Sequence, residues 1–141
     1  MTAYVDASVL LRVALDQPGA LAEWPRIRRG VACSLVRTES LRTLDRFRLQ
    51  QALSDAEVAT RRALILGFVN ALEIVNLDSV VLDRAAQPMP TALGTLDAIH
   101  LAAALLWRES TGEDLVMATH DGALALGARA HGFLVVGVSP S

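Results

Sequence analysis

Four carboxylates stand where the sequence predicts that strands end and the following helices begin. Asp6 and Asp121 each come at the end of a short apolar run, and Glu39 and Asp97 lie near the beginnings of two predicted helices. The carboxyl ends of parallel strands share one edge of a sheet, and α/β proteins bind their ligands beyond that edge. We therefore expect the four side chains to converge.

Converging carboxylates repel one another unless cations neutralise them. Oxygen ligands without cysteine and without paired histidines suit Mg²⁺, with Mn²⁺ as a substitute, rather than Zn²⁺. Negative charge that one divalent ion leaves uncompensated raises the pKa of a neighbouring carboxyl, which can then act as a base. Such a site suits the hydrolysis of phosphodiesters, because metal ions polarise the phosphoryl group and help to deprotonate water.

Each acid taken alone also has an ordinary structural explanation. Asp97 in the first turn of a helix complements the helix dipole, and Asp121 is a candidate N-cap. Glu39 fits a capping box, and Asp6 fits a turn. Only the joint placement of the four acids points to a metal site.

Short apolar runs alternate with helix-length segments along the whole chain. The pattern predicts strands over residues 2–6, 31–35, 73–77, 115–119 and 133–138. It predicts helices over residues 8–15, 20–30, 34–50, 54–71, 80–86, 95–110 and 123–132, with caps at Ser34 or Thr38 and at Ser54. This alternation is typical of an α/β fold, with a parallel sheet of about five strands and helices on both faces.

Length and composition favour a single globular domain over residues 1–141. The chain has 141 residues, of which 52% are hydrophobic and 20% are charged, the reverse of the disordered composition. No apolar run reaches the length of about 18 residues that a spanning helix needs. The amino-terminal apolar stretch carries Asp6, Arg12 and Asp16, which argues against a signal peptide. A cytoplasmic protein that does not enter membranes is expected.

Two residue types exclude several classes of site. Cys33 is the single cysteine, so neither an intrachain disulfide nor a cysteine-built zinc site is expected. The thirteen basic residues are all arginine. The absence of lysine excludes the P-loop lysine and Schiff-base chemistry.

The net charge of −2 conceals an uneven distribution. Residues 24–62 carry nine arginines against four acids, for +5, whereas residues 1–23 carry −2 and residues 63–141 carry −5. The basic segment is either a set of solvated helix faces or a patch that faces phosphates. Aromatic residues make up 4% of the chain, too few for a stacking platform, so recognition of RNA would depend on shape, backbone contacts and arginine.

Four strings in order also carry a family resemblance: YVDASVLL, RTESLRTL, LGTLDAIHLAAALL and MATHDGALALGARAHGFLVVGVSP. Together they resemble the PIN-domain ribonuclease toxins of the VapC family, from type II toxin–antitoxin systems. The resemblance implies a Mg²⁺-dependent endoribonuclease that cuts structured RNA, such as transfer or ribosomal RNA, and leaves a 5′-phosphate. It also implies a homodimer and neutralisation by a VapB-type antitoxin, which we expect in the groove between the first helices and the helical pair at residues 35–70.

The resemblance assigns roles to individual residues. Asp6 and Asp97 would hold the metal ion, and Glu39 would complete the acidic pocket and orient the attacking water. The four acids implied as catalytic and metal-binding are Asp6, Glu39, Asp97 and Asp121. Ser8 and Thr119 occupy the positions of hydroxyl groups that accompany the site.

Other polar and aromatic residues have mainly structural interpretations. His100, one turn after Asp97, either faces the site or packs the helix on the sheet, and packing is favoured. His120 is next to Asp121 and is a weaker candidate for a phosphate contact. The residues interpreted as structural are His131 at a helix end, Cys33 in the core, and Trp24 and Trp107 in the core or a subunit contact.

Two other functions remain as alternatives. A Mg²⁺-dependent phosphomonoesterase also needs aspartates at strand ends, but Asp6 is not followed by a second acid two residues later, and the chain has no lysine. A catalytically inactive PIN-like binding module would keep the fold alone. The presence of all four acids argues against it.

Overall fold

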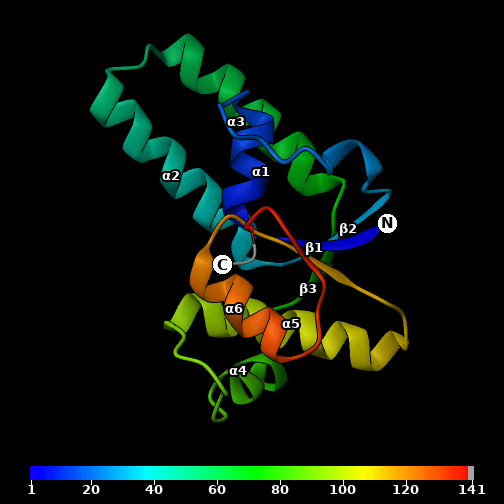
Figure 1. The fold of residues 1–141 in the computed structure, drawn as a ribbon. Helices are drawn as coiled ribbons and strands as arrows, with labels where there is room; N and C mark the ends of the chain where they lie inside the picture. The colour runs from blue at the N-terminus through cyan, green and yellow to red at the C-terminus, as the bar shows by residue number, and fades with distance from the viewer. Residues whose placement is uncertain (140–141) are drawn as a thin grey trace.

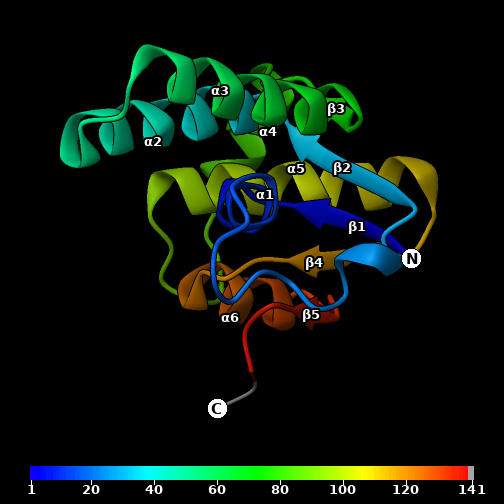
Figure 2. The same cartoon turned by 90° about the horizontal axis from the view of Figure 1, so that it is seen from above.

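A parallel sheet forms the centre of the protein, whose computed structural model describes residues 1–139. Its strands are β1 Thr2–Val5, β2 Arg29–Cys33, β3 Glu73–Val75, β4 Val116–Ala118 and β5 Val135–Val136. They lie in the order β3-β2-β1-β4-β5, and every pairing is parallel (Figure 2). The predicted sheet of about five parallel strands is confirmed, and all the carboxyl ends share one edge.

Helices cover both faces of this sheet, as predicted. They are α1 Ala7–Ala14, α2 Leu35–Gln51, α3 Asp55–Asn70, α4 Ser79–Ala85, α5 Thr95–Thr111 and α6 Gly122–Ala130. Helices α1 to α3 lie on one face and α4 to α6 on the other, and the α2–α3 pair extends beyond the sheet (Figure 1). Successive residues of a strand point to opposite faces, so Ala3 and Val5 join one core and Tyr4 joins the other.

The helix predicted over residues 20–30 is wrong. The structure has only a 3₁₀ turn at Trp24–Arg26, and β2 begins two residues earlier than predicted. Pro25 fits the first turn of a helix because it has no N–H to donate. Beyond it the chain extends beside the amino terminus, where the backbone N–H of Arg28 donates to the carbonyl of Met1 over 3.0 Å. A long-range pairing therefore replaces the helical hydrogen bonds.

Some predicted boundaries and caps also change. The last strand is two residues long rather than the whole of 133–138. The Ser54 hydroxyl accepts from the Glu57 N–H over 3.2 Å and caps α3 as predicted. Ser34 stands at the N-cap position of α2 but makes no capping hydrogen bond, and its hydroxyl accepts from the Leu77 N–H over 3.0 Å instead. It links α2 to the segment after β3.

The side chains predicted for the core are mostly buried. Cys33 is fully buried and Trp107 is nearly so. Trp24 is only half-buried and packs edge to face against Phe68, with 5.5 Å between ring centroids. Within residues 1–139, no helix is long and apolar enough to cross a bilayer.

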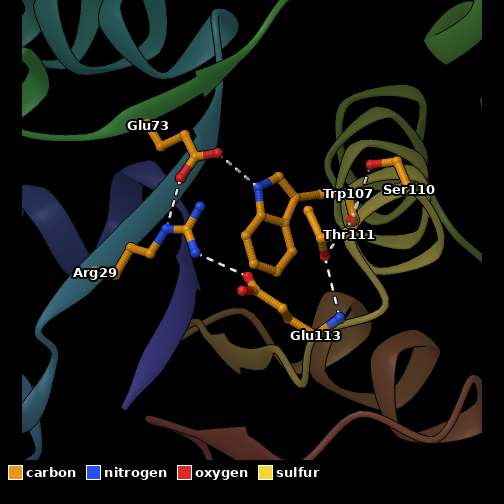
Figure 3. A network of polar contacts seen from close by, with 6 residues as sticks. All are labelled: Arg29, Glu73, Trp107, Ser110, Thr111 and Glu113. Atoms are coloured by element: carbon orange, nitrogen blue, oxygen red, sulfur yellow. Dashed lines mark hydrogen bonds and ion pairs between the residues drawn. The ribbon is translucent and has the colours of Figure 1, made fainter.

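A polar network joins the amino ends of the strands (Figure 3). The Arg29 guanidinium donates from Nε to Glu73 and from Nη1 to Glu113, each over 2.8 Å. The Trp107 indole N–H also donates to Glu73 over 3.1 Å, and the Arg29 guanidinium carbon lies 5.1 Å from the centroid of the indole ring. The network connects β2, β3, α5 and the loop before β4, at the end of the sheet opposite the predicted site.

We expect Trp107→Phe to lower the Tm by about 2–5 °C without affecting activity. The change removes the indole N–H that donates to Glu73 and weakens the contact with Arg29. Trp24→Phe is the matched control, because the Trp24 indole N–H has no partner within the described chain. Calorimetry on both variants checks the difference, and equal changes in Tm would show that loss of ring size alone matters.

Candidate active site

Asp6 is the most firmly held acid of the site. It follows β1 and caps α1, where its Oδ1 accepts from the Val9 N–H over 3.2 Å. The Ser8 hydroxyl donates to the same oxygen over 2.5 Å, and the Thr119 hydroxyl donates to Oδ2 over 2.5 Å. The side chain is only 6% exposed. These donors hold the carboxylate in one orientation at the carboxyl edge of the sheet.

Both predicted hydroxyl groups therefore contact the first acid, and they also connect it to the loop after β4. The Ser8 hydroxyl accepts from the His120 N–H over 3.1 Å. The Thr119 hydroxyl accepts from the Asp121 N–H over 3.0 Å. Thr119 is fully buried. A hydrogen-bonded bridge thus sets the distance between the ends of β1 and β4.

Asp97 and Asp121 face the same edge from two different helices. Asp121 caps α6 by accepting from the Leu124 N–H over 2.9 Å, so its predicted capping role is confirmed. Asp97 is half-buried in the first turn of α5. Burial, together with repulsion from the carboxylates of Asp121, Asp6 and Glu39, raises the pKa of Asp97. Asp97 is therefore close enough to the other three predicted acids to be affected by their charges.

Glu39 projects from α2 and is held by His100 of α5. Its Oε1 lies 2.6 Å from Nε2 of His100, and Nδ1 of His100 lies 2.7 Å from the hydroxyl of Tyr4. The Tyr4 hydroxyl accepts from the Cys33 N–H over 3.1 Å. Burial is the main cause that raises the pKa of Tyr4 well above its ordinary value. His100 thus both packs α5 on the sheet and contacts a predicted acid.

The described chain contains no preformed cage for a metal ion. Across residues 1–139, no three side chains from histidine, cysteine, aspartate and glutamate lie close enough together to ligate one ion. The site is instead an open group of carboxylates that share negative potential. Mg²⁺ keeps several of its waters and is commonly held by one or two carboxylates, so such a group is compatible with this ion.

A sequence comparison now places the chain in a family. The family model for the PIN domain matches residues 3–125. The chain belongs to the PIN family. Ribonuclease VapC46 of Mycobacterium tuberculosis (strain ATCC 25618 / H37Rv) is 35% identical to this PIN protein over 140 residues, which cover 96% of this chain and 97% of the relative. The predicted resemblance to the VapC family is therefore confirmed.

Solved structures share this PIN fold. A toxin–antitoxin complex from Klebsiella pneumoniae matches with a TM-score of 0.67 and 17% identity, over 99% of this chain and 98% of the other. PAE2754 from Pyrobaculum aerophilum matches with a TM-score of 0.60 and 21% identity, over 95% and 89% of the two chains. At these identities the likeness establishes the fold alone.

The structure brings Tyr4 and His100 next to the acids of the PIN site. The sequence gives no signal for Tyr4, and for His100 it leaves a place at the site as the less favoured alternative to packing. The spacing of His100 and Asp97 on one helix gave a partial signal, because residues three apart share a helix face. The His120 ring contacts the segment after β5, where its Nδ1 lies 3.0 Å from the Gly137 carbonyl oxygen. Its predicted phosphate contact stays untested.

Proposed function

We propose that this VapC-family protein is the toxin of a type II toxin–antitoxin system and a Mg²⁺-dependent endoribonuclease that cuts structured RNA. The observation that carries the proposal is the group of four carboxylates at the carboxyl edge of the sheet, where burial and then repulsion from the other three acids raise the pKa of Asp97. The relative's name, Ribonuclease VapC46, supports the same activity. We also propose that residues 1–141 form one PIN domain, supported by the pairing of β5 with β4.

The donor set fits a divalent magnesium ion. The acids Asp6, Glu39, Asp97 and Asp121 would hold it, directly or through its waters, and all of them offer hard oxygen atoms. Burial is the largest cause of the raised pKa of Asp97, and repulsion from the neighbouring acids adds to it; a bound cation would relieve that repulsion. When bound, Mg²⁺ would polarise the phosphoryl group and favour deprotonation of a water molecule. Mn²⁺ would serve as a substitute.

The side chains of this protein would position the reactants around that ion. Ser8, Val9 and Thr119 all donate to Asp6, so this carboxylate can meet the ion without reorganising. Glu39 would orient the attacking water with its second carboxylate oxygen, because Oε1 is already paired with His100. The water oxygen would bond to phosphorus as the bond to the 3′-oxygen breaks, giving a 3′-hydroxyl and a 5′-phosphate.

We propose a folded RNA in the cytoplasm, such as a transfer or ribosomal RNA, as the substrate. The arginines of α2 and α3 supply the positive charge that an RNA backbone needs. Several are engaged locally, since Arg42 and Arg48 both pair with Asp45. Arg37 is exposed and no salt bridge holds it within the described chain, but it lies two positions before Glu39 and therefore on a different face of α2.

A VapB-type antitoxin is proposed as the partner, with a homodimer as the toxin's own assembly. A groove of about 280 Å³ lies between α1 and α2, beside Ser8, and it includes Leu11, Arg12 and Phe47. This is the predicted position for an antitoxin peptide that covers the acids. The Klebsiella pneumoniae neighbour, a toxin–antitoxin complex of the same fold, supports such a partner.

Asp6→Asn is expected to reduce cleavage of folded RNA more than about 100-fold. The change removes one negative charge from the acids while keeping the size of the side chain, and the hydroxyls of Ser8 and Thr119 can turn to pair with the amide. Chelation of divalent ions should abolish cleavage in the wild type, and added Mg²⁺ should restore it. The assay follows end-labelled transfer and ribosomal RNA on denaturing gels.

The matched control is Asp114→Asn, which removes the same charge from an exposed acid next to Glu113, at the opposite end of the sheet. It should cleave RNA like the wild type. Cleavage that persists in Asp6→Asn or in chelator would refute the mechanism. Release of phosphate from small monoesters without RNA cleavage would favour the phosphomonoesterase. No hydrolysis of either substrate, with RNA still bound, would favour an inactive binding module.

A further inference from the structure

A buried chain of hydrogen bonds runs from the backbone of β2 to Glu39 at the candidate site. It passes from the Cys33 N–H through the Tyr4 hydroxyl and the His100 imidazole to the Glu39 carboxylate. We propose that Tyr4 and His100 are positioning residues, which hold Glu39 in the orientation that phosphodiester hydrolysis requires. This inference rests on the proposed function and adds two residues to it.

The first support is geometric. The Tyr4 hydroxyl lies 2.7 Å from Nδ1 of His100, and Nε2 of the same ring lies 2.6 Å from Oε1 of Glu39. Tyr4 is fully buried and His100 is 2% exposed, whereas the Glu39 side chain is 24% exposed. The series of hydrogen bonds therefore has one end that is buried and anchored at Tyr4. Its other end, at Glu39, reaches solvent, where a substrate would arrive.

One assignment of donors and acceptors satisfies every group in this series of hydrogen bonds. The Cys33 N–H donates to the Tyr4 oxygen, and we assign the Tyr4 O–H as the donor to Nδ1 of His100. With Nδ1 accepting, the ring carries its proton on Nε2 and donates it to Glu39. Each polar hydrogen in the chain then has an acceptor.

This direction determines what Glu39 can do. Its Oε1 is engaged by the imidazole, so Oε2 is the oxygen left to orient a water molecule or meet a metal-bound water. A glutamate side chain has several rotatable bonds, and ordering it on arrival of the substrate would cost conformational entropy. The hydrogen bond from His100 orders the side chain in advance, which is how outer residues support the ligands of metal sites.

The fold explains why these residues meet. Asp97 and His100 are three positions apart on α5 and share a helix face, so one helix supplies an acid and the residue that orients another. Tyr4 belongs to the core between the sheet and α5. Glu39 comes from α2, whose buried residues Val36 and Leu44 belong to the core on the opposite face. The chain of hydrogen bonds thus connects the two faces around the carboxyl edge.

The test compares four variants in steady-state cleavage of folded RNA with saturating Mg²⁺. Glu39→Gln and His100→Phe should each lower kcat about 10–100-fold with little change in KM, and Tyr4→Phe should lower it by a smaller factor. His100→Gln should recover part of the loss, because its amide can still donate to Glu39. The matched control is His131→Gln, at the far end of α6, which should leave kcat unchanged.

Two readouts separate positioning from general loss of structure. His100→Phe introduced into the Glu39→Gln background should cause no further fall in kcat, because His100 acts through Glu39. In the metal-free wild type, ¹⁵N NMR should show the His100 proton on Nε2. Additive losses in the double variant, or a proton on Nδ1, would overturn the proposal.

The outcomes also distinguish this inference from the proposed function. If the wild type cleaves RNA and Asp6→Asn does not, but His100→Phe keeps the wild-type kcat, the positioning role is wrong and the function stands. If the wild type cleaves no RNA, the proposed function fails, while the NMR result still tests the geometry of the hydrogen-bond chain. Thermal unfolding of every variant shows whether a loss of activity is only a loss of folded protein.

Discussion

Asp97→Asn should lower RNA cleavage about 1,000-fold and at the same time raise the Tm of the metal-free protein by about 1–4 °C. The first effect follows from removing an acid that would hold the metal ion. The second follows from burial and the repulsion from Asp121, Asp6 and Glu39, which raise the pKa of Asp97 and disfavour its ionised form. No hydrogen bond to the Asp97 side chain is lost within the described chain.

The direction of the Asp97 pKa shift determines how the stability difference between the wild type and Asp97→Asn depends on pH. In the unfolded chain Asp97 has a pKa of about 3.9, and in the folded protein its pKa is higher. The wild type should therefore lose stability relative to the variant as the pH rises through the interval between the two values. Below pH ~3.9 the two proteins should have the same stability. Above the folded pKa the advantage of the variant should be constant.

Thermal unfolding between pH 3 and pH 8 in chelator measures this difference, with Asp114→Asn as the control. Asp114 is exposed, so the control should change neither cleavage nor the pH profile. Added Mg²⁺ should stabilise the wild type more than Asp97→Asn, since a ligand that binds only the folded state raises its stability. A variant that is less stable than the wild type at pH 7 without metal would contradict the argument from repulsion.

Gly137→Ala is expected to destabilise the protein by about 2–4 kcal/mol and to lower the Tm by about 8–15 °C. Gly137 has a φ of +101°, outside the range of ordinary side chains. An added Cβ would lie 2.2 Å from the carbonyl oxygen of Thr119 and 3.0 Å from its carbonyl carbon. These are backbone atoms of the segment that leaves β4, where the Thr119 N–H donates to Val136 over 3.0 Å.

A shift of Thr119 caused by this clash would also disturb Asp6 of the candidate site, because the Thr119 hydroxyl donates to Asp6. Cleavage by Gly137→Ala should therefore fall even at temperatures where the variant is folded. Gly122→Ala is the matched control, since an added Cβ there meets no atom within 4 Å and the residue begins α6. Calorimetry and the RNA assay on both variants test the prediction, and a wild-type Tm for Gly137→Ala would contradict it.

Local chemistry made most of the fold predictable. Asp121 and Ser54 cap helices where expected, and Gly112 ends α5 in the left-handed conformation with a φ of +68°. The alternation of apolar runs and helices was sufficient to predict a parallel sheet. The error at residues 20–30 arose because extended pairing with Met1 involves residues distant in sequence. Helix propensity does not include such contacts.

By itself, the sequence determined the α/β class, the four acids and their positions near the ends of strands, because these depend on residue type and short-range periodicity. Only the tertiary structure decided how the acids are held. Ser8 and Thr119 meet on Asp6 although they are 111 positions apart in the chain, and Tyr4 is 96 positions from His100. Such contacts depend on which strands become neighbours and on the face of α5 that packs against the sheet. Hydrogen bonds between residues that are distant in sequence form only after folding has brought the intervening segments of the chain to closure.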